Sequence, residues 1–230
     1  MTNVQLSSRL QRIADFIPHG DRIIDVGTDH AYIPIDLLLK DPAARAIATD
    51  IRPGPLHRAR SDAEKYGVSD RLTLLECDGL SLCRPSDCDT VILAGMGGET
   101  MIGILSAAPW TKEKNLILQP QTKQDELRAW LAGAGFTIRD AALVHDTGHI
   151  YMVWDVERGE MPPWRGVDSA LLARRDPLLK PFLEDQIKRC RKRLNGLQKA
   201  ATQDEAGIAA LREQLAALEE IHREVETWQV

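Results

Sequence analysis

Apolar residues along the first 160 positions follow two periods in turn. Short runs rich in β-branched residues, such as 23–26, are followed by stretches in which apolar residues recur at helical spacing. Strands that alternate with helices predict a parallel sheet with helices on both faces, and therefore an α/β fold. The expected strands are 22–26, 46–49, 72–76, 90–94 and 115–118, and the expected helices are 6–16, 33–40, 56–66, 98–105 and 122–131.

The alternation ends in two longer strand-like runs, 137–145 and 150–157. The turn sequence Asp146-Thr147-Gly148 is expected to join them as a β-hairpin. Five parallel strands followed by an antiparallel hairpin is the strand count of the Rossmann-like sheet of class I methyltransferases. A nicotinamide-binding Rossmann domain more often continues with parallel units, so the strand pattern favours the methyltransferase type of sheet.

The last third of the chain has a different pattern. The Pro-rich segment 161–166 has the composition of a linker, and beyond it apolar residues recur every three or four positions, which indicates coiled-coil helices. Turn and N-cap residues at 202–204 favour two helices folded back as an antiparallel hairpin, while one long dimerising helix is the alternative. We therefore expect a methyltransferase domain at 1–160 and a helical coiled-coil domain at 161–230. The expected seam is Leu183, Ile187, Cys190, Leu194, Leu197 and Ala201, then Ile208, Leu211, Leu215, Leu218 and Val225.

The composition is that of a soluble globular chain, because 43% of its 230 residues are hydrophobic and 27% are charged. The sequence contains no apolar run long enough to span a bilayer and no secretory segment, and we expect a cytoplasmic protein without membrane contact. The four cysteines lack zinc-ligand spacing, so free thiols in a reducing compartment are expected.

Charge is distributed unevenly along the chain. The net charge of −5 argues against a general nucleic-acid binder. Residues 165–199, however, hold 10 basic and 4 acidic side chains, whereas 200–230 hold 2 basic and 7 acidic ones. The basic cluster of the first tail helix either follows a phosphate backbone or flanks a coiled coil that the acidic second helix neutralises. This cluster consists of Lys188, Arg189, Arg191, Lys192 and Arg193.

Three carboxylates lie at the ends of consecutive expected strands, namely Asp25, Asp50 and Asp78. In a doubly wound sheet these ends line one ligand-binding crevice, although aspartate is also common where loops begin. Gly27 stands without the further glycines of a dinucleotide site, and three carboxylates would repel a phosphate. S-Adenosylmethionine, which is cationic and carries no phosphate, fits this set. Asp25 would bind its methionine amino group, Asp50 its ribose hydroxyls and Asp78 its adenine amine.

A glycine-rich segment, Ala94-Gly95-Met96-Gly97-Gly98, follows the fourth expected strand. In a methyltransferase this segment faces the sulfonium of the donor and the substrate, and small residues let a flat base approach. The alternative is a helix N-terminus with ordinary flexible glycines. The expected cofactor-binding residues are Asp25, Gly27, Asp50, Asp78, Gly79, Ala94, Gly95 and Met96.

Three blocks of sequence resemble the bacterial tRNA adenine N1-methyltransferase family called TrmK. They are DVGTDHAYIP at 25–34, AGMGG at 94–98 and LILQP at 116–120. The resemblance covers 6–156 and extends more loosely to the helical tail. It implies methylation of ring nitrogen 1 of adenosine 22 in tRNA by S-adenosylmethionine, with the basic cluster as an RNA-binding element. Thr28 stands where serine is common, and Gln121 where asparagine is expected.

The resemblance also implies a mechanism and three catalytic candidates. Ring nitrogen 1 of neutral adenine has a free lone pair, so transfer is an in-line displacement driven by alignment and desolvation. The product is cationic until its amine loses a proton, and Asp29 is the candidate carboxylate that stabilises this charge. His30 or Tyr32 would stack on the base or orient it. Alternatively, both residues belong to a packed first helical turn.

Other functions fit parts of the pattern. A class I methyltransferase that acts on another RNA or a small molecule fits the same fold. A nicotinamide-dependent oxidoreductase would need a second glycine near Thr28 or Asp29, and a coiled-coil adaptor would not need the three strand-end carboxylates. The histidines of 145–149 lie at an expected β-turn and methyl transfer needs no metal, so we expect no metal site. A monomer and a weak homodimer both fit the tail.

Overall fold

The computed structural model describes residues 4–164, 166–199 and 204–229. The chain divides into two compact units, Met1–Pro162 and Pro163–Val230. The boundary falls between two adjacent prolines of the Pro-rich segment. Over the described ranges, no helix is both long and apolar enough to cross a membrane.

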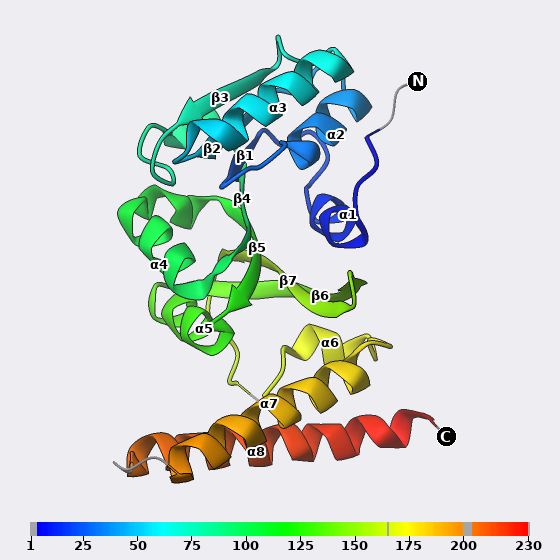
Figure 1. Ribbon diagram of the computed structural model, residues 1–230, viewed down its shortest axis with the longest axis vertical. Helices are drawn as coiled ribbons and strands as arrows, with labels where there is room; N and C mark the ends of the chain where they lie inside the picture. Colours follow the sequence, from blue (N-terminus) through cyan, green and yellow to red (C-terminus); the bar gives the residue numbers. More distant parts are fainter. Residues whose placement is uncertain (1–3, 165, 200–203, 230) are drawn as a thin grey trace. The chain divides into compact units, whose positions relative to one another are not determined.

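A seven-stranded sheet forms the centre of the first unit (Figure 1). Five parallel strands come first along the chain, and an antiparallel hairpin follows, which confirms the predicted fold class. The spatial order β3-β2-β1-β4-β5-β7-β6 reverses direction between β1 and β4, and ligands of doubly wound sheets bind at such a switch point. The strands are β1 (Ile23–Val26), β2 (Ala46–Asp50), β3 (Leu72–Glu76), β4 (Thr90–Gly97), β5 (Asn115–Thr122), β6 (Phe136–Asp146) and β7 (His149–Arg158).

Helices cover the sheet in two groups (Figure 1). Helices α1, α2 and α3 pack in sequence against one another, and α4 and α5 pack together. Right-handed crossovers explain this division. The chain passes from β1 to β2 and β3 on one side of the sheet's centre, and from β4 to β5 on the other side. Helix α1 also contacts the hairpin strands β6 and β7. The elements are α1 (Ser8–Asp15), α2 (Tyr32–Lys40), α3 (Pro53–Tyr66), α4 (Gly98–Ala107) and α5 (Gln124–Gly133), with the 3-10 helices η1 (Pro85–Asp87) and η2 (Pro109–Glu113).

The central strands are covered on both faces, which explains why their sequence is apolar without interruption. All four residues of β1 are buried, and Ile23, Ile24 and Leu93 have no exposed surface. Burial of such a side chain contributes about 1.5–3 kcal/mol of hydrophobic free energy. The sheet is therefore a rigid base for the turns at its carboxyl edge.

The glycine-rich segment differs from its prediction. The predicted strand ends at Ala94, but β4 continues to Gly97 beside an equally extended β5. Gly95 lies out of register between the paired residues Ala94 and Met96, with a φ of 75°. Glycine adopts this left-handed backbone readily, so the strand accommodates a bulge and pairing resumes beyond it.

The second unit contains a short helix followed by a hairpin of two long helices. Arg191 of α7 forms an ion pair of 2.7 Å with Glu219 of α8, and Cys190 Sγ lies 3.4 Å from the Leu211 carbonyl oxygen. The hairpin therefore forms within one chain, as the sequence predicts; the expected seam residue Ala201 and the turn residues Thr202 and Gln203 lie outside the described residues. The elements are α6 (Ser169–Ala173), α7 (Leu179–Lys199), α8 (Glu205–Glu226) and the 3-10 helix η3 (Thr227–Gln229).

Candidate active site

Asp25 lies within β1, close to the switch point of the sheet. Its side chain is only 8% exposed, and Thr28 Oγ1 donates a hydrogen bond of 2.7 Å to Asp25 Oδ2. The backbone N–H groups of Gly27 and Thr28 both donate to the Thr49 carbonyl oxygen, which holds the turn after β1 against β2. Burial raises the pKa of Asp25 to about 6, although the Thr28 hydrogen bond opposes this shift.

Gly27 brings the turn after β1 against the glycine-rich segment of β4. Its φ is 73°, and a Cβ at this position would lie 2.9 Å from Met96 Cε. A larger residue would strain the backbone and displace Met96. The structure therefore brings together Gly27 and Met96, which the sequence assigns to the same donor site from positions 69 residues apart.

Asp50 and Asp78 lie at the ends of neighbouring strands. Asp50 is buried at the end of β2, and its Oδ1 accepts a hydrogen bond of 2.8 Å from the Arg52 backbone N–H. Asp78 is exposed and follows β3 by two residues. The Thr49 hydroxyl donates a hydrogen bond of 3.0 Å to the Gly79 carbonyl oxygen, which connects the turn after β3 to β2. The predicted carboxylates thus lie at or near the carboxyl ends of three adjacent strands.

Ile51 is a further candidate residue at this edge that the sequence interpretation missed. It follows Asp50 directly, and 62% of its surface is exposed, which is unusual for a large apolar side chain on the described surface. The sequence could have indicated this residue, because an isoleucine that follows the last residue of a strand is not buried by the sheet. An exposed apolar face here suits a flat heterocycle.

The catalytic candidates Asp29, His30 and Tyr32 lie between β1 and the first turn of α2. The Nδ1 atom of His30 lies 2.6 Å from Asp62 Oδ2 of α3, and its ring stacks on Tyr32 with centroids 4.9 Å apart. Asp29 is exposed and forms an ion pair with Arg58 of α3. Burial raises the pKa of Tyr32, so its hydroxyl is neutral at physiological pH. Neither contact with α3 was predicted.

Arg9 is a second residue that the sequence interpretation missed. From α1, its Nη1 donates a hydrogen bond of 2.7 Å to Oε1 of Gln119, which is fully buried on β5. The guanidinium carbon lies 5.4 Å from the ring centroid of Tyr151 on β7. No sequence motif indicates these contacts, because Arg9 is 110 positions from Gln119 and 142 positions from Tyr151.

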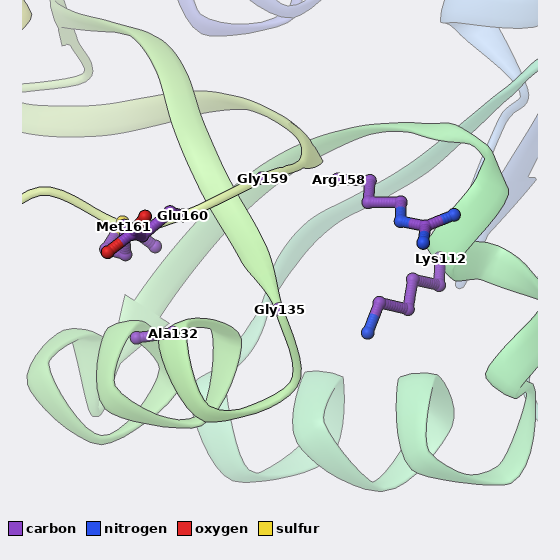
Figure 2. A pocket seen from close by; sticks show the side chains of 7 residues that line it. All are labelled: Lys112, Ala132, Gly135, Arg158, Gly159, Glu160 and Met161. Carbon is purple, nitrogen blue, oxygen red and sulfur yellow. The ribbon is translucent and has the colours of Figure 1, made fainter.

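A separate cavity of about 410 Å³ lies at the opposite, amino edge of the parallel strands. Figure 2 shows Lys112 and Arg158 on one side of it and Glu160 and Met161 on the other. Arg158 forms an ion pair of 2.7 Å with Glu113. None of the predicted site residues lines this cavity, whose lining is Lys112, Ala132, Gly135, Arg158, Gly159, Glu160 and Met161.

The predicted RNA-binding cations all lie exposed on α7, in the second unit. Arg189 forms an ion pair of 2.7 Å with Asp185, and Arg191 forms one with Glu219 of α8. Over the described ranges, Lys188, Lys192 and Arg193 form no ion pair. One carboxylate of α7 and one of the acidic helix α8 thus pair with two of the five cations, and the other three are available.

The chemistry that this arrangement supports is binding of a cationic, hydroxyl-rich ligand. Two buried carboxylates and an exposed one lie at the carboxyl edge of β1, β2 and β3, next to the glycine-rich segment of β4. Within the described part of the chain, no group of three or more His, Cys, Asp or Glu side chains is arranged to hold a metal ion. All four cysteines are buried free thiols, as predicted.

Known proteins resemble this chain over most of its length. A family model for a methyltransferase domain matches residues 6–154. The tRNA (adenine(22)-N(1))-methyltransferase of Bacillus subtilis is 35% identical over 162 residues, which cover 70% of this chain and 68% of that protein. The crystal structure of the B. subtilis m1A22 tRNA methyltransferase TrmK has a TM-score of 0.84 at 27% identity, covering 96% of this chain and 100% of that one. A Streptococcus pneumoniae protein crystallised with S-adenosyl-L-methionine is 28% identical with a TM-score of 0.74, covering 95% and 100%.

Proposed function

The chain belongs to the TrmK family of bacterial methyltransferases, and we infer that it uses S-adenosylmethionine to methylate ring nitrogen 1 of adenosine 22 in tRNA. The sequence predicts this activity, and the relatives confirm it. The observation in the structure that carries the conclusion is the row of carboxylates at three adjacent strand ends of a methyltransferase sheet. Because tRNA is the substrate, we propose that the protein acts in the cytoplasm.

We propose that the first unit is the methyltransferase domain and that its carboxyl edge orients the donor. Asp25 binds the methionine ammonium, and Asp50 accepts hydrogen bonds from both ribose hydroxyls. Ile51 packs on the adenine ring, and Asp78 accepts a hydrogen bond from the adenine amine. The positions of the buried carboxylates and the exposure of Ile51 support this orientation. The remaining residues proposed around the donor are Gly27, Gly79, Ala94, Gly95 and Met96.

The proposed chemistry needs alignment more than proton transfer. The lone pair of ring nitrogen 1 attacks the methyl carbon in line, the carbon–sulfur bond breaks, and the sulfonium becomes a neutral thioether. We propose that the stacked pair His30–Tyr32 supports the target base, since Asp62 fixes the His30 ring. Asp29 stabilises the cationic product and exchanges its Arg58 partner for the base. The proposal requires no metal.

We propose that the second unit binds tRNA through α7. Lys188, Lys192 and Arg193 are exposed and form no ion pair within the described residues, so they are available to phosphate groups. Arg189 and Arg191 would have to exchange their carboxylate partners first. The hairpin closes on itself within one chain, which supports a monomer as the active form.

Incubation of unmodified tRNA with the protein and labelled S-adenosylmethionine tests the function. Nucleoside mass spectrometry is expected to detect 1-methyladenosine, and fragment mapping is expected to place it at position 22. A transcript with guanosine 22 is the matched control and should accept no label. Labelling of the control transcript, or of a nucleoside other than adenosine, would instead support a methyltransferase with another RNA target, and the absence of label from tRNA would favour a small-molecule substrate.

A further inference from the structure

Arg9 places a cation beside β4 and β5 at the carboxyl edge of the sheet, where the sequence predicts none. Its Nη1 donates to Gln119 Oε1 at 2.7 Å and lies 3.6 Å from the position that a Cβ on Gly95 would occupy. Gln119 is a neutral amide with no exposed surface. The guanidinium is therefore fixed beside the bulge of β4 by a neutral hydrogen-bond partner, and its charge also interacts with the nearby Asp146 carboxylate.

The position of Arg9 is set by the docking of α1 on the β6–β7 hairpin. Asp146 Oδ2 accepts a hydrogen bond of 3.1 Å from the Arg9 backbone N–H, and Ser7 also hydrogen-bonds to this carboxylate. These contacts lower the pKa of Asp146, so it remains an anion at the N-terminus of α1. Asp146 thus holds the backbone of the helix, and the Tyr151 ring lies 5.4 Å from the guanidinium carbon.

The guanidinium retains unused hydrogen-bonding capacity. It carries five N–H donors, of which the structure pairs Nη1 with Gln119. Among the described residues, no carboxylate lies within 4.0 Å of the Arg9 side-chain nitrogens. A guanidinium held in this way is suited to bind one oxyanion through two parallel hydrogen bonds.

The direction of the donor along the sheet identifies the oxyanion. In the proposed function, Asp50 at β2 binds the ribose and Asp78 beyond β3 binds the adenine. The methionine group must then extend the other way, across β1 toward β4 and β5, where Arg9 lies. S-Adenosylmethionine has one anionic group, the α-carboxylate at this end, and none of the predicted aspartates is suited to bind it. We propose that Arg9 binds the α-carboxylate of the donor.

This inference rests on the proposed function, and two ligands that differ by one carboxylate test it. Calorimetry compares S-adenosylmethionine with decarboxylated S-adenosylmethionine, which keeps the sulfonium and the ammonium. The unsubstituted protein is expected to prefer S-adenosylmethionine by about 10- to 100-fold. Arg9→Gln is expected to bind both ligands with nearly equal affinity, and Arg9→Lys to keep part of the preference.

Arg12→Gln is the matched control. Arg12 lies one turn further along α1 and pairs with Asp15 at 3.8 Å, so its removal changes the charge of the helix without touching the edge. This variant is expected to keep the full preference. Each ratio of affinities compares two ligands on the same protein sample, so partial unfolding of Arg9→Gln does not distort it. The unsubstituted protein tests the role of the carboxylate without any substitution.

Equal affinity of the unsubstituted protein for the two ligands would overturn the inference and leave the proposed function intact. A retained preference in Arg9→Gln together with weaker tRNA binding would also overturn it, because the oxyanion would then be a tRNA phosphate. Failure of the unsubstituted protein to bind S-adenosylmethionine at all would instead overturn the proposed function.

Discussion

Asp25 shows how folding and ligand binding make opposite demands on one residue. Its carboxylate is almost fully buried, and one hydroxyl hydrogen bond replaces the water that it loses. Burial raises the pKa of Asp25 to about 6, because the charged carboxylate loses more solvation than the protonated acid does. The proposed ligand supplies the missing cation, so the charge is compensated only when the donor is bound.

The first prediction concerns the stability of Asp25→Asn. The folded-state pKa of Asp25 lies above the value of the unfolded chain, so its contribution to stability is present at low pH and is lost as pH rises through about 6. An asparagine keeps the shape without the charge. We expect Asp25→Asn to raise the free energy of unfolding at pH 8 by about 1–3 kcal/mol. Urea unfolding at pH 8 and pH 4 checks this, and a gain that does not shrink at pH 4 would contradict it.

The second prediction concerns donor binding and pH. The methionine ammonium requires an ionised Asp25, so affinity for S-adenosylmethionine should fall as pH drops below about 6. At pH 5 we expect about tenfold weaker binding than at pH 8. Calorimetry over this range checks it, and Asp25→Asn should bind weakly with a flat profile. A sloping profile in the variant would assign the titration to another group.

Residues next to a strand end could be predicted from the sequence, and residues that reach the site from elsewhere could not. Asp25 and Asp50 could be identified from the sequence because each carboxylate directly adjoins a strand-like apolar run. Arg9 and Asp62 act through side chains of helices whose packing places them against β5 and His30. Such contacts depend on the rotation and tilt of a helix, which periodicity alone does not fix.

Among the elements, β4 and β5 continue well beyond their predicted ends. Local glycine content indicated a loop, but pairing with β5 extends the strand to Gly97 across a bulge at Gly95. Helix α4 then begins at Gly98, where a Cβ would lie 2.4 Å from the Lys123 carbonyl oxygen. The glycines therefore serve different purposes, and Gly98 is required by close packing against the backbone after β5.

The third prediction compares two glycines of α4. Gly98→Ala should destabilise the protein by about 1–3 kcal/mol, because a backbone carbonyl cannot move aside as a flexible side chain does. Gly103→Ala is the matched control, since no atom lies within 4 Å of its Cβ position. That change should stabilise by about 0.5–1 kcal/mol through helix propensity. Thermal unfolding of both variants checks the pair, and equal effects would contradict the packing argument.

Across the whole molecule, charge is distributed unevenly along the chain. The first 160 residues are net acidic, whereas five of the cations of α7 are concentrated within six positions. The sequence predicted both the hairpin and the complementary charge of its helices, and the Arg191–Glu219 ion pair confirms that the helices pair in this way. It could not predict which cations would remain available, because this depends on the register of α7 against α8.

The last prediction follows from that register. Lys192→Gln with Arg193→Gln removes two cations that form no ion pair within the described residues, whereas Arg212→Gln removes an exposed cation of α8 as a control. The double variant should weaken tRNA binding and lower the slope of log affinity against log salt by about two. Its affinity for S-adenosylmethionine should not change, since the residues proposed to bind the donor lie in the other unit. Unchanged tRNA affinity of the double variant at physiological salt would exclude α7 from the RNA site. An equal loss of tRNA affinity in Arg212→Gln would show that net charge alone explains the effect.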